Sequence, residues 1–231
     1  MRSPVHPFFV SVLSGAIFLL LSLSASAQHY EQRFKAGAFL GFNAGQIDGD
    51  DHQGYRKLGL LAGLRGATVL GDRFELDTEL SFSQRGSKSS KGSGGSLFSG
   101  GAPDRGAFDL SLSYVEAAFL LNYLTYETYD DYYAIHLHGG LSYGRLIGSE
   151  VQETTTFKPE VVPMNVLKPW FTKNDINLIL GASVYVTENL GLTLRHSVEL
   201  TPLFDPERHP DVASTRLMQY FLSVSVVYMV F

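Results

Sequence analysis

The final segment of the chain, residues 216–231, alternates in polarity with a period of two. Every second residue from Met218 to Val230 is apolar or aromatic, whereas the positions between them include Gln219, Ser223 and Ser225. Because successive side chains of a β-strand point to opposite faces, this pattern predicts one strand with an apolar face and a smaller, more polar face. Most strands of soluble domains span about 5–6 residues, so the length favours a transmembrane barrel. A soluble sandwich or lipocalin-like barrel is the alternative for this segment alone.

The same alternation recurs along the chain and defines eight segments. Their approximate spans are 33–45, 56–69, 73–85, 109–123, 133–146, 174–187, 190–201 and 216–231. The connections after the second, fourth and sixth segments are short, and those after the other segments are longer. Short turns at one rim and long loops at the other are typical of bacterial outer-membrane barrels. The sequence therefore predicts an all-β fold, an eight-stranded antiparallel up-and-down transmembrane β-barrel.

The facing of the segments places charge inside the predicted barrel. When the apolar positions face lipid, nine charged residues fall on the interior face: Lys35, Arg65, Glu75, Asp77, Glu79, Arg85, Glu116, Arg195 and Glu199. An eight-stranded barrel is narrow enough for side chains to fill it, so we expect the five carboxylates to pair with the four cations. The pairings themselves depend on strand register, which the sequence does not reveal. The same facing turns Leu110 and Leu112 inward near the long-loop end.

Aromatic residues gather near the predicted short-turn rim. They are Phe74, Tyr123, Tyr126, Tyr129, Tyr132, Tyr133, Tyr228 and Phe231. Because amphipathic rings favour the level of the lipid headgroups, this clustering indicates an aromatic girdle.

Residues 1–27 have the layout of a secretory signal peptide. Arg2 precedes an apolar run from Phe8 to Leu23, and the sequence Ala25-Ser26-Ala27 forms a small-x-small cleavage site. The run is short for a spanning helix, which needs about 20 apolar residues, although a retained anchor is the alternative. We expect residues 1–27 to be a signal peptide and residues 28–231 to be the outer-membrane barrel domain.

Residue types that serve in active sites and metal centres occur without the spacing that such chemistry needs. The chain has no cysteine. His136 and His138 share one strand face and could ligate a metal, but hydrogen-bonded barrel residues are the simpler interpretation. Asp48, Asp50 and Asp51 lack the later glutamate of a calcium-binding loop. We therefore predict no catalytic, cofactor-binding or metal-ligating residues and no cofactor. With a net charge of -5 and no basic stripe, nucleic acid is not an expected partner.

Three stretches of the chain resemble the PorT-like outer-membrane β-barrel family of Bacteroidota. They are GAFLGFNAGQIDGDDHQGYRKLGLLAGL at 37–64, LSFSQRGSK at 80–88 and LSYVEAAFLLNYL at 112–124. The resemblance covers essentially the expected mature chain, and the order of the motifs is more specific than any one of them. It implies a barrel shape and an outer-membrane location. Most members of this family have no known activity, so the resemblance implies no particular chemistry.

These patterns favour a non-enzymatic protein of the outer membrane of a Gram-negative bacterium, exported through a cleaved signal peptide. Its lumen would be plugged by side chains, and it would act structurally or bind a protein partner through external loops such as the Gly/Ser-rich residues 87–101. Outer-membrane lipid is the other expected partner. The alternative is a narrow pore or an accessory subunit of an outer-membrane transport or secretion complex. A lipid-modifying enzyme and a secreted barrel with an apolar ligand are further classes, and the latter would carry its apolar residues inside.

Overall fold

The computed structural model describes residues 33–48, 55, 57–88, 108–153, 164–208 and 216–230. Within these residues the chain forms eight strands: β1 (Phe34–Asp48), β2 (Lys57–Gly71), β3 (Phe74–Lys88), β4 (Phe108–Glu127), β5 (Tyr133–Glu153), β6 (Asn174–Tyr185), β7 (Leu190–Glu199) and β8 (Met218–Val230). Each predicted segment is a strand, so the predicted strand number is confirmed. The expected signal peptide, residues 1–27, lies outside the described residues.

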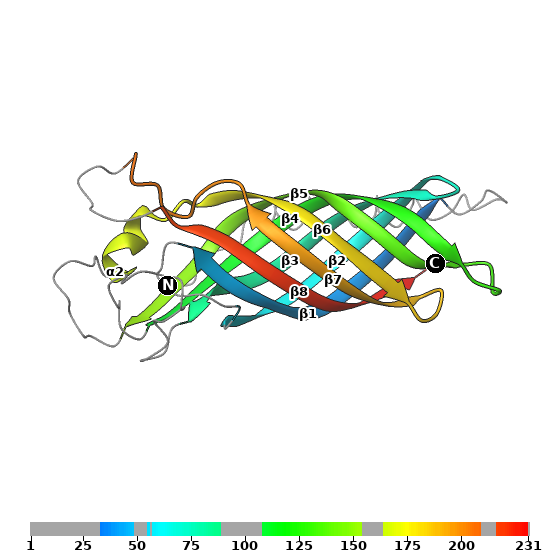
Figure 1. Cartoon of the computed structure of the whole chain (residues 1–231), viewed down its shortest axis with the longest axis horizontal. Helices are drawn as coiled ribbons and strands as arrows, with labels where there is room; N and C mark the ends of the chain where they lie inside the picture. Colours follow the sequence, from blue (N-terminus) through cyan, green and yellow to red (C-terminus); the bar gives the residue numbers. More distant parts are fainter. Residues whose placement is uncertain are drawn as a thin grey trace, which may run out of the picture. The chain divides into compact units, whose positions relative to one another are not determined.

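The strands pair antiparallel in chain order and close into a barrel. β8 returns to pair with β1 from Ala36↔Val230 to Asp48↔Met218, which completes the circle (Figure 1). The short connections 72–73, 128–132 and 186–189 lie at one end of the barrel, which we call the turn rim. The opposite end, where the longer connections lie, is the loop rim. The predicted up-and-down barrel is therefore confirmed, with short and long connections at opposite rims.

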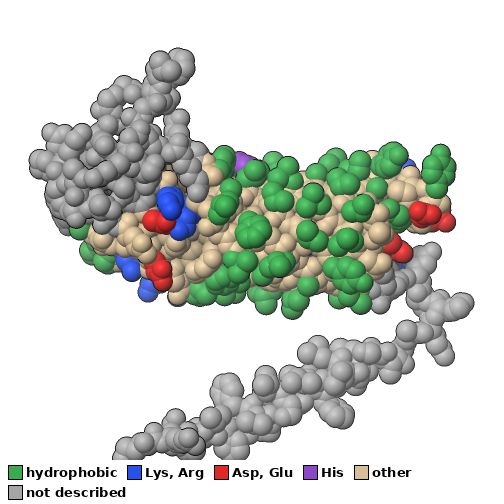
Figure 2. Space-filling view, turned by 90° about the horizontal axis from the view of Figure 1, so that it is seen from below, with side chains coloured by type: hydrophobic (Ala, Val, Ile, Leu, Met, Phe, Trp, Pro, Cys, Tyr) green, Lys and Arg blue, Asp and Glu red, His purple; other side chains and the backbone are tan. Residues whose placement is uncertain are grey.

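The alternation of polarity corresponds to two faces of the barrel wall. On β1, Leu40 and Phe42 face outward and are 61% and 62% exposed, whereas Asn43 faces inward and is 0% exposed. On β8, Val224 and Val226 are outside, and Ser223 and Ser225 between them are buried. Hydrophobic side chains accordingly cover the wall over most of its length, and charged ones gather toward the ends (Figure 2). This exterior is suited to hydrocarbon, since each strand alternates an apolar side chain outside with a polar or small one inside.

The connection expected at residues 147–173 is only partly a loop, and here the sequence prediction was wrong. β5 continues to Glu153 and pairs with β4 as far as Phe108↔Glu153, past a register shift opposite Ser113 and Tyr114. Farther on, α2 (Met164–Leu167) and η2 (Lys168–Trp170) form a short helical stretch. Met164 and Leu167 of α2 and Phe171, which follows η2 in an extended conformation, are all buried. Among the described residues, no helix combines the length and apolarity needed to cross a membrane.

Glycines let β3 approach β1 closely near the loop rim. A Cβ on Gly45 would lie 2.5 Å from the backbone oxygen of Gly86, and Gly86 itself has a φ of 154°. The side-chain Nδ2 of Asn43 donates to the backbone oxygen of Gln84 at 2.9 Å and to Ser83 Oγ at 3.0 Å. These contacts join two strands that are not neighbours in the sheet, so the barrel interior is narrow at this level.

Candidate functional site in the barrel interior

Six charged side chains pair inside the barrel toward the turn rim, and we call them the turn-side cluster: Lys35, Arg65, Glu75, Asp77, Glu79 and Arg195. Glu79 lies between two arginines. Its Oε1 accepts hydrogen bonds from Arg65 Nε at 2.7 Å and Arg195 Nη2 at 2.8 Å, and its Oε2 accepts one from Arg195 Nη1 at 2.7 Å. Arg65 Nε is also 3.5 Å from Asp77 Oδ2, and Lys35 Nζ donates to Glu75 Oε1 at 2.9 Å. Three cations thus face three carboxylates.

The strand register explains how the two arginines reach one carboxylate. Arg65 on β2 and Glu79 on β3 are directly opposite each other in the ladder. Arg195 comes from β7, which is not a neighbour of either strand, and therefore extends across the lumen. Its Nε donates to His138 Nε2 at 3.0 Å, and its Cζ lies 6.0 Å from the centroid of the Phe39 ring. Through these contacts, Arg195 links β7 to Glu79 on β3 and to His138 on β5.

Four charged side chains occupy the interior toward the loop rim, and we call them the loop-side cluster: Arg85, Glu116, Asp175 and Glu199. Arg85 is 1% exposed and is the one cation among them. Its Nη2 donates to Glu116 Oε2 at 2.8 Å and lies 3.0 Å from Asp175 Oδ2, and its Nη1 donates to Asn177 Oδ1 at 3.3 Å.

Arg85 is also enclosed by two aromatic rings. Its Cζ lies 4.1 Å from the centroid of Tyr114 and 4.4 Å from that of Phe221. A guanidinium placed over ring faces gains from the negative potential of the π-system. The position of this buried cation is therefore defined by both its carboxylate partners and its aromatic neighbours.

The prediction that every interior carboxylate pairs with a cation is confirmed for Glu75, Asp77, Glu79 and Glu116 and is wrong for Glu199. Among the described residues, no lysine, arginine or histidine nitrogen lies within salt-bridge distance of Glu199. Its Oε2 instead accepts from the backbone N–H of Gln219 at 2.8 Å, and its Oε1 accepts from Gln219 Nε2 at 3.3 Å. Arg85, the cation of this cluster, contacts Glu116 and Asp175.

One of those carboxylates, Asp175, was missed by sequence reasoning. It is 1% exposed and is the second residue of β6, at the loop-rim end of that strand. It faces the interior next to Asn177 on the same face. The signal that could have found it is parity, because Asn177, Gly181 and Ser183 share the odd-numbered polar face of that segment. Extending the alternation two residues toward the start of the strand places Asp175 inside.

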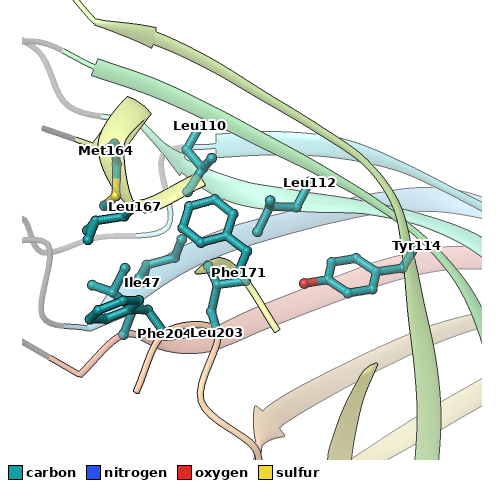
Figure 3. Close-up of a cluster of buried hydrophobic side chains, with 10 residues drawn as sticks. Ile47, Leu110, Leu112, Tyr114, Met164, Leu167, Phe171, Leu203 and Phe204 are labelled. Carbon is teal, nitrogen blue, oxygen red and sulfur yellow. The ribbon is translucent and has the colours of Figure 1, made fainter. Parts of the chain in front are cut away.

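An apolar cluster closes the interior at the loop rim above the loop-side cluster, and we call it the cap. It consists of Ile47, Leu110, Leu112, Tyr114, Met164, Leu167, Phe171, Leu203, Phe204 and Leu217 (Figure 3). Leu110 and Leu112, whose inward facing the sequence predicts, are both 0% exposed because residues from two connections pack against them. Met164, Leu167 and Phe171 come from the β5–β6 connection, and Leu203 and Phe204 come from the β7–β8 connection.

A second apolar cluster packs beside the turn-side cluster. Phe39, Leu61, Ala67, Tyr185, Val227 and Met229 form it, and Tyr132 packs against it. Tyr185 joins this cluster to the charges, since Arg65 Nη1 donates to its hydroxyl at 3.4 Å. Apolar side chains therefore lie among the turn-side charges, and the cap covers the loop-side cluster at the loop rim.

The candidate metal ligands of the sequence have other partners. His136 Nε2 is 3.0 Å from the backbone oxygen of Tyr133, and its ring packs on Tyr185 with centroids 4.4 Å apart. His138 receives the hydrogen bond from Arg195 described above. Asp48 lies at the end of β1, whereas Asp50 and Asp51 fall outside the described residues. The part of the chain that the structure describes contains no group of three or more residues suited to holding a metal ion.

The expected aromatic girdle is present on the exterior near the turn rim. Tyr123, Tyr126 and Tyr228 are exposed there, and the rings of Phe74 and Tyr123 lie 5.5 Å apart. Tyr132 differs from the expectation, because it is half-buried and its hydroxyl donates to the backbone oxygen of Val186 across the turns. Phe231 lies outside the described residues.

Comparison with known proteins agrees with this architecture. The family model described as outer membrane protein beta-barrel domain matches residues 26–205. No curated protein sequence matches the chain.

Among solved structures, 23 chains match. Ail, the attachment invasion locus protein of Yersinia pestis, is 10% identical with a TM-score of 0.45, and the match covers 86% of this chain and 100% of Ail. Neisserial surface protein A (NspA) is 12% identical with a TM-score of 0.41 over 85% of this chain and 97% of its own. A de novo designed transmembrane β-barrel is 8% identical with a TM-score of 0.40 over 88% of this chain and 100% of its own.

Proposed function

The chain belongs to the outer membrane protein beta-barrel domain family, and from that membership we propose that it is a non-enzymatic outer-membrane barrel whose lumen is plugged by side chains. The observation that carries the proposal is the position of Glu79 between Arg65 and Arg195, because these three residues bridge the lumen from β2 and β3 to β7. All three residues are at most 5% exposed, which supports a filled lumen at this level. The cap covers the charges at the loop rim, and the second apolar cluster packs among the turn-side charges.

A narrow pore is the competing function, and the two functions differ in whether the interior conducts ions. A pore needs a continuous wet path past both charged clusters, whereas the plugged barrel offers none. The purified protein in a planar lipid bilayer should therefore give no conductance steps above the bare membrane. Steady ohmic steps that disappear when the protein is heat-denatured would favour the pore or an accessory transport subunit.

We further propose that the loop rim faces the cell exterior and binds a partner. Residues 87–101 comprise the last two residues of β3 and part of the connection from β3 to β4 at that rim, and they are rich in Gly and Ser. An epitope tag placed within them should be labelled by antibody on intact cells, with a tag in the 128–132 turn as the matched control that is labelled only after permeabilisation. The opposite pattern would invert the orientation. A pull-down through the exposed tag then identifies the partner.

Export and location are part of the same proposal. We expect cleavage after Ala27, at the end of the small-x-small sequence 25–27. From the motifs at 37–64, 80–88 and 112–124 we further propose that the chain is a PorT-like member of the family and lies in an outer membrane of the Bacteroidota type. The protein should fractionate with outer membranes and run at a different apparent mass in unheated and heated gel samples. N-terminal sequencing should begin at Gln28, and an intact Met1 would contradict the cleavage.

A further inference from the structure

Glu199 in the loop-side cluster takes part in none of the salt bridges described above. We propose that Glu199 is held in its neutral, protonated form, and that loss of its proton loosens the cap at the loop rim. The lumen would thus contain a proton-linked switch. This inference goes beyond the proposed function, since it concerns how the loop rim responds to pH whether or not the barrel conducts.

The surroundings of Glu199 favour the neutral form. The residue is 1% exposed, and its hydrogen-bond partners among the described residues are the backbone and side-chain nitrogens of Gln219. A buried carboxylate without a cation beside it carries a large desolvation cost, and taking up a proton removes that cost. Glu79, the same residue type in the turn-side cluster, instead accepts three hydrogen bonds from two arginines.

The charged groups around Glu199 also favour its neutral form. Arg85 on β3 is bound to Glu116 of β4 and to Asp175 of β6, and Arg195 of β7 itself is bound to Glu79. On β6, Asn177 is the ladder partner of Glu199, so Asp175 lies on the diagonal of the same interior face. Arg85 therefore contacts two of the three carboxylates, and repulsion between Asp175 and an ionised Glu199 would add to the cost of ionising Glu199.

One residue, Gln219, connects Glu199 to the cap. Gln219 Nε2, which donates to Glu199, also donates to the hydroxyl of Tyr114 at 2.9 Å. Tyr114 is the other titratable group in this contact and is itself a member of the cap. Two residues from Gln219, Leu217 packs in the cap and its backbone pairs with Phe204. A negative charge on Glu199 would draw water to the underside of this apolar cluster and weaken its packing.

The chain supplies its own reporter for the cap. Trp170 is the single tryptophan of the sequence and directly precedes Phe171, a cap residue. Acrylamide quenching of its fluorescence in detergent micelles measures how accessible this segment is. We compare wild type, Glu199→Gln and Asp175→Asn from about pH 6 to about pH 10, a range above the ordinary titration of free carboxyls. Urea unfolding of the same samples gives the stability of the whole barrel.

The proposal predicts that quenching of wild type rises with pH, whereas quenching of Glu199→Gln stays at its low-pH level. A carboxyl that is neutral in the folded state loses stability as pH rises above the range in which the unfolded chain titrates, about pH 4.3 for glutamate. The urea midpoint of Glu199→Gln should therefore already exceed that of wild type at about pH 6, because the unfolded wild type is ionised there, and the difference should widen toward alkaline pH until the folded carboxyl ionises as well. Asp175→Asn should lower the midpoint at every pH, because Asp175 contacts Arg85 as an anion.

Each other outcome overturns the proposal. If wild-type quenching is flat, no group linked to the cap titrates. If wild type and Glu199→Gln rise together, another group such as Tyr114 is responsible, and a flat profile in Asp175→Asn alone would place the proton on Asp175. If Glu199→Gln is less stable than wild type at about pH 6 or fails to fold, Glu199 acts as an anion, because glutamine has nearly the shape of a neutral glutamic acid.

Discussion

The turn-side and loop-side clusters are built from the same residue types at two levels of one lumen, yet their charges are balanced differently. The turn-side cluster sets Lys35, Arg65 and Arg195 against three carboxylates. The loop-side cluster sets Arg85 alone against Glu116, Asp175 and Glu199. The difference shows that burial by itself does not decide whether a carboxylate is part of a salt bridge. The two clusters differ in whether a cationic nitrogen of lysine or arginine lies within reach of each carboxylate.

The two clusters also differ in redundancy. Glu79 would keep Arg65 if Arg195 were lost, and it would keep Arg195 if Arg65 were lost. Glu116 and Asp175 have no second cation among the described residues within salt-bridge distance. We therefore expect the turn-side cluster to tolerate a single substitution better than the loop-side cluster does.

The largest effect should come from Arg85→Met. This change leaves Glu116 and Asp175 buried without a cation, so the loss should reach or exceed the about 3–5 kcal/mol typical of breaking a buried ion pair. Urea unfolding in micelles measures it, with Arg208→Met, whose side chain is 71% exposed, as the matched control. Equal midpoints for the two variants would mean that the loop-side cluster is not a buried ion pair.

Arg195→Ala should cost less, at the lower end of the same range of about 3–5 kcal/mol. The variant removes both hydrogen bonds to Glu79 Oε2 and Oε1 from β7 but leaves the one from Arg65. The measurement is again the urea midpoint, with Arg208→Ala as control. A loss larger than that of Arg85→Met would reverse the comparison between the clusters.

A smaller effect is expected from Gly144→Ala on β5. A Cβ there would lie 2.0 Å from Asp175 Oδ1 and 3.2 Å from Arg85 Nη2, so the ion pair must shift. Overpacking of this kind costs about 1–3 kcal/mol. Gly148→Ala on the same strand is the matched control, because its nearest neighbour would be Ser113 Cβ at 3.7 Å. If both alanine variants unfold at one midpoint, the Arg85–Asp175 contact is looser than described.

The smallest effect should come from Asp109→Asn at the loop rim. Asp109 pairs with Lys57 and with Lys88, but its side chain is 28% exposed and that of Lys88 is 57% exposed. Such partly solvated pairs contribute about 0–1 kcal/mol and are screened by salt. Asp77→Asn makes the same chemical change beside Arg65 and should lower the midpoint clearly more. A larger loss for Asp109→Asn would show that the rim pair is better shielded from water than its exposure implies.

The faces of the strands could be predicted from the sequence because they depend only on local alternation. Leu110 and Leu112 illustrate this. They share the even-numbered face of β4 with Glu116, so alternation places them inside, although apolar side chains of a transmembrane barrel generally face outward. The cap that accounts for them could not be predicted. Most of its other members come from two connections far apart in the chain, and the spacing of Met164, Leu167 and Phe171 gives no indication of where that helical stretch packs.

The charged residues show the same division between local and long-range information. The inward facing of Arg195 and Glu79 follows from the pattern of each strand. Their contact does not, because it joins residues separated by 116 positions and depends on closure of the barrel and on register. Glu199 demonstrates the consequence, since a count of interior charges suggested a cation for it where the geometry provides Gln219.

A double-mutant cycle between Arg195 and Glu79 tests most directly whether the lumen is a filled, buried ion-pair core. Wild type, Arg195→Ala, Glu79→Ala and the double variant are unfolded by urea in micelles, and the coupling free energy is the non-additive part. A water-excluded pair predicts a coupling toward the upper end of the about 0.5–3 kcal/mol found for interacting residues. A coupling within about 0.3 kcal/mol of zero would mean that water screens the pair, and the lumen would then be an open, solvated channel.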